Sequence, residues 1–126
     1  MSRFGAAILG CEGLRLTQAE KTLFADTHPF GFILFARNIE NPIQIKDLCA
    51  ELRASVGHDA PILIDQEGGR VQRLRQPYWR EWMPPLDHVT ASGDEAWEAM
   101  YLRYRLIALE LRALGIDANC APMVDV

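Results

Sequence analysis

The sequence has few cysteines, and they follow no pattern that would bind zinc or form a disulfide framework. Cys11, Cys49 and Cys120 are far apart in the chain, and no Cys-x-x-Cys motif or Cys/His cluster accompanies them. We expect each to be a reduced thiol that packs as a small apolar side chain. A zinc site and a disulfide-stapled fold are both excluded as interpretations.

Long apolar runs and an excess of basic residues are missing as well. The longest apolar stretch, residues 30–36, is far shorter than the roughly 20 residues that cross a bilayer. The apolar run at residues 6–9 is too short for the core of a secretory signal. Thirteen basic against seventeen acidic side chains give a net charge of −4, which favours neither nucleic acid nor an anionic membrane as a partner. We therefore expect a cytoplasmic protein.

Strand-like and helix-like segments alternate along the chain, in a composition typical of one globular domain. Short apolar runs at residues 5–9, 31–36, 61–65 and 116–126 predict four strands, each separated from the next by a helical stretch. This alternation is typical of right-handed βαβ units with a parallel sheet.

The helices are indicated by their end signals. Capping boxes at residues 17–20 and 92–95 predict two helix starts, and Asn41 followed by Pro42 predicts a third, in a helix that runs to Gly57. Residues 78–85, rich in aromatics and proline, are interpreted as a loop. The helix after residue 92 carries a stripe that we expect to be core: Ala96, Met100, Tyr104, Ile107, Ala108, Leu111 and Leu114.

Two α/β architectures fit four such units. One is half of a (β/α)8 barrel, which closes only with eight strands and typically about 250 residues. The other is an open doubly wound sheet, complete with four strands, whose ligand crevice lies at the carboxyl ends of the strands. The hydrophobic periodicity of the sequence does not distinguish between these two architectures.

The most informative segment is Asp65-Gln-Glu-Gly-Gly-Arg-Val-Gln-Arg-Leu74, which follows the third expected strand. Its two glycines allow the chain to turn sharply over a cleft. Asp65 and Glu67 are two apart, so in extended chain they share a face at roughly 7 Å, near the roughly 5 to 5.5 Å of a retaining glycosidase's carboxyl pair. The simpler interpretation is an ion pair between Asp65 and an arginine that pins the loop, and it does not exclude sugar binding.

Residues 65–73 of this segment resemble the signature of bacterial β-N-acetylglucosaminidases of glycoside hydrolase family 3. Gly31-Phe-Ile-Leu-Phe-Ala-Arg-Asn38 resembles the family's second-strand segment, and Ala121-Pro-Met-Val-Asp125 its fourth-strand segment. The resemblance therefore covers the chain in order. It implies that residues 1–126 are a single partial domain, the N-terminal half of a TIM-type barrel.

The resemblance also implies a function. The parent enzyme would be a cytoplasmic, retaining exo-β-N-acetylglucosaminidase that removes terminal N-acetylglucosamine from anhydromuropeptides in cell-wall recycling, without metal or other cofactor. In that family the positions that match Asp65 and Arg73 contact the sugar. The resemblance therefore disfavours Asp65 and Glu67 as a catalytic pair. Glu67 is expected to hold the glycine turn. Arg37, Asn38 and Asp125 stand at expected strand ends and are candidates for lining the site.

The family's Lys-His-Phe-Pro-Gly segment, histidine-bearing acid/base loop and nucleophilic aspartate would all lie beyond Val126. We therefore expect no catalytic residue in this chain and no hydrolysis by it alone. Two alternatives stay open: a β-glucosidase or xylosidase relative, and a non-catalytic half-barrel that binds sugar or an anion through its arginine-rich loop. In either case, open sheet edges predict dimerisation or aggregation of the chain.

Overall fold

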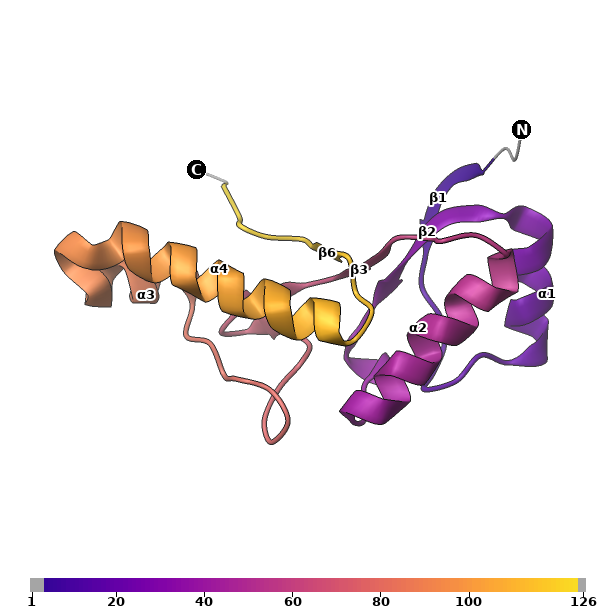
Figure 1. Ribbon diagram of the computed structural model, residues 1–126, viewed down its shortest axis with the longest axis horizontal. Coiled ribbons are helices and arrows are strands. Elements are labelled where there is room, and N and C mark those ends of the chain that lie inside the picture. The colour runs from indigo at the N-terminus through magenta and orange to yellow at the C-terminus, as the bar shows by residue number, and fades with distance from the viewer. Residues whose placement is uncertain (1–3, 125–126) are drawn as a thin grey trace.

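The computed structural model describes residues 4–124, and within them a parallel sheet is packed against helices (Figure 1). The sheet strands are β1 (Gly5–Leu9), β2 (Pro29–Leu34), β3 (Ile62–Ile64) and β6 (Ala118–Asn119). The α-helices are α1 (Gln18–Thr27), α2 (Pro42–Val56), α3 (Pro85–Ser92) and α4 (Ala96–Ala113). Short 3-10 turns η1 (Ala36–Asn38) and η2 (Gly93–Glu95), and a hairpin of β4 (Gln66–Gly68) and β5 (Val71–Gln72), complete the described elements.

The sheet has the strand order β1-β2-β3-β6, with every pair parallel. Strands of this sheet that follow one another in the chain are therefore neighbours. A doubly wound sheet requires a point where the strand order reverses, and this sheet has none. This is the topology of four consecutive units of a β/α barrel. The described strands form an open sheet rather than a closed barrel.

The helices cover one face of this sheet. Phe32 and Leu34 of β2 and Ile62 and Ile64 of β3 are fully buried in a single core cluster, to which the helices also contribute. The residues between them, such as Ile33, are only partly buried. The sheet is therefore covered on one side, which is the arrangement of a barrel wall. The nearly all-apolar sequence of residues 31–36 predicts instead a strand covered on both faces, and this prediction is wrong.

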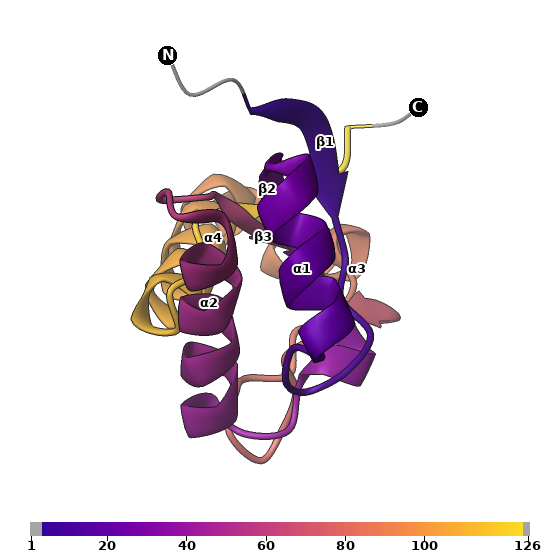
Figure 2. The same cartoon turned by 90° about the vertical axis from the view of Figure 1, so that its right-hand side faces the viewer.

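Helix ends follow the sequence signals at two of the three predicted positions. Thr17 and Glu20 form a capping box at the start of α1, and Asn41 caps α2, which ends at Gly57 with a φ of 67°. Figure 2 shows α1 and α2 lying side by side. The third prediction, a capping box at residues 92–95, is wrong: Ser92 has helical dihedrals and its hydroxyl donates to the His88 carbonyl.

Residues 78–85 are not entirely loop. Pro85 starts α3, because proline fits the first turn of a helix, and α3 with the first part of α4 projects beyond the sheet (Figure 1). The stripe expected to be core on α4 is only partly so: Ile107, Leu111 and Leu114 are buried, whereas Ala108 is exposed. No helix among residues 4–124 combines the length and apolarity that a bilayer crossing demands.

β1 covers the predicted residues 5–9, β2 is displaced, and β3 and β6 are shorter than predicted. β2 starts and ends two residues before the predicted 31–36, and β6 covers only two of residues 116–126. β3 ends at Ile64, which leaves Asp65 at the exit of the strand. Cys11 and Cys49 are buried free thiols, as predicted, and Cys120 is partly buried.

Candidate sugar-binding site

The candidate site starts where β3 ends. Side chains alternate along a strand, so Asp65 has the orientation of Leu63, away from the helix-facing Ile62 and Ile64. Asp65 thus stands at the carboxyl edge of the sheet, on the face that the helices leave open. Its side chain is 20% exposed, which leaves it within reach of a ligand.

A tight hairpin brings Arg73 back to Asp65. β4 and β5 pair in antiparallel fashion around Gly68 and Gly69, whose φ angles of 108° and 62° favour glycine. Arg73 follows β5, and its Nη2 donates to Asp65 Oδ2 at 2.7 Å. The prediction of an ion pair that pins this loop is therefore confirmed.

Two buried glutamines hold the hairpin, and sequence reasoning missed both. Gln66 Oε1 accepts from the backbone N–H groups of Arg73 and Leu74 at 3.1 and 3.0 Å, and its Nε2 donates to the Leu74 carbonyl at 2.9 Å. Gln72 donates from Nε2 to the carbonyls of Leu74 and Arg80, both at 2.7 Å. The signal that could have found them is the alternation of the motif itself, which buries every second residue from 62 to 68 and again residues 72 and 74.

The hairpin is also tied to the last strand. The backbone N–H of Gln66 donates to Asn119 Oδ1 at 2.9 Å, and Asn119 Nδ2 donates to the Gln66 carbonyl at 3.0 Å. The Asn119 side chain therefore pairs with Gln66 as a backbone peptide would. This contact fixes the start of the hairpin against β6.

Arg37 lies near the pair, through a shared aromatic ring. The guanidinium carbons of Arg37 and Arg73 lie 4.8 and 5.7 Å from the centre of the Phe35 ring. Arg37 also donates from Nε to the Cys11 carbonyl at 3.0 Å and is exposed. The structure thus places Arg37 on the same rim as Arg73.

Asn38 does not line the site, contrary to the expectation. Its side chain is fully buried, donates to the carbonyls of Cys11 and Gly13 at 3.1 and 2.8 Å, and accepts from the Phe35 N–H at 2.9 Å. A side chain that is fully buried and engaged in this way is out of reach of a ligand. Asn38 instead joins the ends of β1 and β2.

Glu67 holds the glycine turn through its main chain. Its carbonyl accepts from Nη2 of Arg103, which belongs to α4. This contact uses the Glu67 main chain and an arginine from a distant helix, so it does not test the expected role of the Glu67 side chain. Asp125, the remaining candidate, lies outside the described residues.

Of the other two loop arginines, the Arg75 side chain is engaged within the loop and the Arg70 side chain is not. Arg75 pairs with Glu81 at 2.9 Å and donates to the Gly69 carbonyl at 2.8 Å. Arg70 is exposed. Since Arg73 and Arg75 are each paired with a carboxylate, the loop is not an open cluster of positive charge.

Cys120 belongs to the surroundings of Asp65. Partial burial raises the pKa of the Cys120 thiol, and the charge of Asp65 raises it further. The thiol is therefore a weak nucleophile beside the ion pair. No group of three or more histidine, cysteine or acidic side chains suited to a metal ion occurs in residues 4–124.

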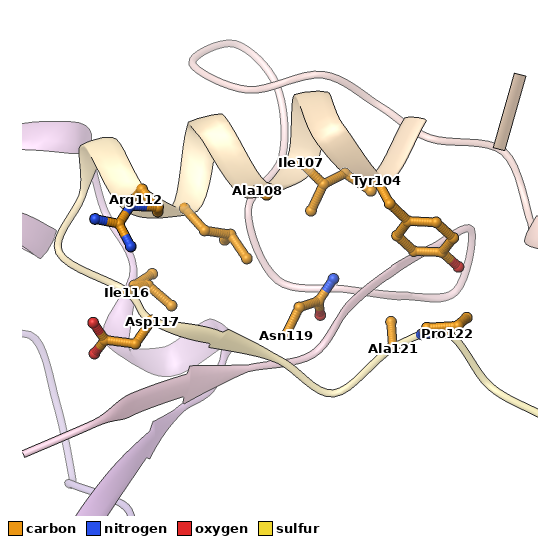
Figure 3. A pocket seen from close by; sticks show the side chains of 10 residues that line it. Tyr104, Ile107, Ala108, Arg112, Ile116, Asp117, Asn119, Ala121 and Pro122 are labelled. Carbon is orange, nitrogen blue, oxygen red and sulfur yellow. The ribbon is translucent and has the colours of Figure 1, made fainter. Parts of the chain in front are cut away.

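A pocket of the molecule lies away from this ion pair. Figure 3 shows a pocket of about 390 Å³ between α4 and the segment around β6, with Tyr104 and Pro122 at one end and Arg112 and Asp117 at the other. Asp65 and Arg73 do not line it. Because it lies on the helix side of the sheet, it is separate from the ion pair.

A sheet wound in one direction, with an acid and an arginine at its carboxyl edge, defines part of a β/α-barrel protein of the kind that carries its site on that edge. The model of the glycosyl hydrolase family 3 N-terminal domain matches residues 5–126. The chain therefore belongs to this family.

Curated relatives agree with this assignment. A β-hexosaminidase of Pseudomonas aeruginosa is 39% identical over 121 residues, which cover 96% of this chain and 35% of the relative. A β-hexosaminidase of Stenotrophomonas maltophilia is 38% identical over 122 residues, which cover 94% of this chain and 36% of the relative. The chain thus spans about a third of the length of the curated relatives it matches.

Solved structures resemble the chain closely. NagZ from Neisseria gonorrhoeae aligns with a TM-score of 0.86 and 33% identity, over 98% of this chain and 37% of its own, and has also been solved with N-trifluoroacetyl-D-glucosamine. A family 3 β-N-acetylglucosaminidase from Paenibacillus sp. aligns with a TM-score of 0.81 and 36% identity, over 94% of this chain and 23% of its own. These alignments confirm the expected α/β barrel-type fold.

Proposed function

We propose that this chain is the N-terminal, sugar-contacting part of a glycoside hydrolase that removes terminal N-acetylglucosamine. The observation that carries the proposal is the Asp65–Arg73 ion pair of 2.7 Å at the carboxyl edge of the open sheet face. The names of the relatives support the same activity.

The pair has the chemistry that a sugar needs. Arg73 engages Asp65 through Oδ2, and a carboxylate has about four lone-pair sites, so capacity remains to accept hydrogen bonds from two hydroxyl groups. The guanidinium in turn fixes the direction of the carboxylate and can itself donate to a ring or hydroxyl oxygen. Arg37 extends the polar rim from the neighbouring strand end.

The finer identity of the reaction rests on the family. We propose that the parent enzyme is cytoplasmic and acts with retention of configuration on anhydromuropeptides from peptidoglycan, in cell-wall recycling, without a cofactor. The structure of the Neisseria protein with an N-acylated glucosamine supports an N-acetylglucosamine-type ligand. A β-glucosidase or xylosidase relative is the rival within the family, and a panel of chromogenic glycosides on the parent enzyme separates the two.

Residues 1–126 are proposed to be one partial domain without catalytic groups of its own. The purified chain should release no chromophore from an N-acetyl-β-glucosaminide. Measurable turnover would contradict this and revive Asp65 and Glu67 as a catalytic pair. The non-catalytic half-barrel alternative predicts sugar binding by this chain and an absence of turnover in every form of the protein.

The binding role of Asp65 has a direct test. Titration of the purified chain with N-acetylglucosamine, followed by NMR, should give a dissociation constant that Asp65→Asn weakens about 10- to 100-fold, as expected for the loss of charged hydrogen bonds. Asp59→Asn is the matched control, because Asp59 is 98% exposed and pairs with Arg53 far from the site. Equal affinity of the wild type and Asp65→Asn would contradict the proposal.

Self-association is a further part of the proposal. Among residues 4–124, β1 and β6 each have a strand neighbour on one side only, and Ile8 of β1 is 44% exposed. Such edges pair readily with other chains. Sedimentation of the chain should reveal dimers or larger species, and a monomer at high concentration would contradict this part.

A further inference from the structure

Arg103 is a charged side chain in a position where charge is costly. It is one of the buried residues of α4, with Ile107 and Leu111, and it is only 1% exposed. Burying a cation is expensive unless its donors are satisfied, and burial lowers the pKa of Arg103. The ion pairs formed by residues 4–124 do not include Arg103.

The donors of Arg103 are instead directed at the glycine turn and its surroundings. Nη2 donates to the carbonyls of Glu67 at 2.5 Å and Met83 at 2.9 Å, and Nη1 lies 3.0 Å from Nδ1 of His88. Since arginine has no acceptor, the His88 contact requires a lone pair on Nδ1. The guanidinium carbon also lies 5.4 Å from the centre of the Trp82 ring.

The fit between Arg103 and the turn is tight. A Cβ on Gly68 would lie 2.1 Å from Nη2 of Arg103 and 2.7 Å from the Met83 carbonyl oxygen. The next residue, Gly69, donates its N–H to the Trp82 carbonyl at 2.6 Å. The turn therefore lies directly on the guanidinium and on the segment that the guanidinium also holds.

The turn that Arg103 contacts connects Asp65 to Arg73. Glu67 is two residues after Asp65, and Gly68 pairs with Val71 in the hairpin that returns the chain to Arg73. A shift of the turn would therefore change the distance over which Arg73 reaches Asp65. We propose that Arg103 is a positioning residue, which sets the hairpin so that Asp65 and Arg73 can bind a sugar together. This inference rests on the proposed function.

The test compares Arg103→Met and Arg103→Lys with Arg105→Met in the full 126-residue chain. Arg105 is the matched control, because it is exposed on the same helix and its only described side-chain bond is to the Tyr101 hydroxyl at 3.3 Å. Two quantities are measured for each variant. They are the dissociation constant for N-acetylglucosamine and the rate of amide hydrogen exchange at Gly69, with Ile64 as an internal reference for the sheet.

Arg103→Met should weaken sugar binding about 10-fold or more and speed exchange at Gly69, because three donated hydrogen bonds are lost. Exchange at Ile64 should stay unchanged. Arg103→Lys should recover part of both effects, since an ammonium keeps the charge and some donors but not the fork. Arg105→Met should match the wild type in both.

The outcomes separate the two proposals. A wild-type chain that does not bind N-acetylglucosamine contradicts the proposed function, whatever Gly69 does. A folded Arg103→Met with wild-type affinity overturns the positioning role. If Arg103→Met does not fold, Arg103→Lys is the deciding variant. Wild-type affinity together with wild-type exchange at Gly69 overturns the positioning role. A loss of affinity with an unchanged exchange rate at Ile64 supports it.

Discussion

Asn38 and Cys11 are joined across two strand ends by a hydrogen bond of 3.1 Å from the Asn38 amide to the Cys11 carbonyl. The same amide group donates to Gly13, and its oxygen accepts from Phe35. We expect Asn38→Ala to destabilise the chain by about 2 to 4 kcal/mol, because several buried polar groups lose their partner. Urea unfolding measures this.

The control for Asn38→Ala is Gln18→Ala, since Gln18 is exposed on α1. Its effect should stay within about 0.5 kcal/mol. If the two variants unfold at the same urea concentration, the Asn38 network does not stabilise the fold.

The spacing of β2 and β3 depends on Gly31. A Cβ at this position would lie 2.6 Å from the carbonyl oxygen of Pro61 and 3.1 Å from its ring. Gly31→Ala should therefore cost about 1 to 3 kcal/mol, because the strands must separate to admit a methyl group. Gly13→Ala is the control, since nothing lies within 4 Å of a Cβ there. A thermal midpoint for Gly31→Ala equal to that of Gly13→Ala would refute the prediction.

Glu51 makes stability depend on pH at the acidic end. A hydrogen bond from Arg15 lowers the pKa of Glu51, and the Leu16 N–H adds to this. A carboxylate with a depressed pKa stabilises the folded state above its unfolded pKa of about 4.3, and this stability is lost as the pH falls through the folded pKa. Wild type should therefore lose more stability than Glu51→Gln between about pH 5 and pH 3, measured by urea unfolding.

The control for the pH series is Glu98→Gln, on an exposed position of α4. It should follow the wild-type curve. A Glu51→Gln curve parallel to wild type over this range would show that the Arg15 contact contributes nothing to folding.

The thiols should react in a fixed order. Burial raises the pKa of Cys11 to about 11 and that of Cys49 to about 12, and both are almost inaccessible. Cys120 is only partly buried, so a disulfide reagent at pH 8 should label it first. Asp65→Asn should make this labelling faster, because it removes a charge that raises the pKa of Cys120.

Asp59→Asn serves again as the control, and it should leave the labelling rate of Cys120 unchanged. Bound N-acetylglucosamine should slow the labelling of wild type. Identical rates in the wild type and Asp65→Asn would place Cys120 outside the influence of the ion pair.

The sequence predicts the helix starts well where a local side chain carries the signal, as Thr17 and Asn41 do. It fails at Ser92, because the same residue type can bond backward to a helical carbonyl and let the helix continue. It also misses α3, since the two prolines at residues 84–85 suggest a loop although one of them fits a first helical turn.

The candidate site divides in the same way. Asp65 and Arg73 follow from a motif, and their pairing confirms one of the two interpretations weighed for it. The contacts that hold the hairpin cannot be predicted from the motif, because Arg103 is 36 residues away from its partner Glu67, and Asn119 is 53 away from Gln66. Contacts of this range leave no trace in local periodicity. The prediction for Asn38 is wrong for another reason, since a position at a strand end does not reveal whether the side chain turns inward.

The ion pair at the rim has a consequence for selectivity. Because Arg73 already neutralises Asp65, the pair itself offers directed donors and acceptors with little net charge. A neutral ligand would be recognised there by the geometry of its hydroxyl groups, with no long-range Coulomb attraction to gather it from solution. Binding of a neutral sugar to this pair should therefore hardly respond to ionic strength.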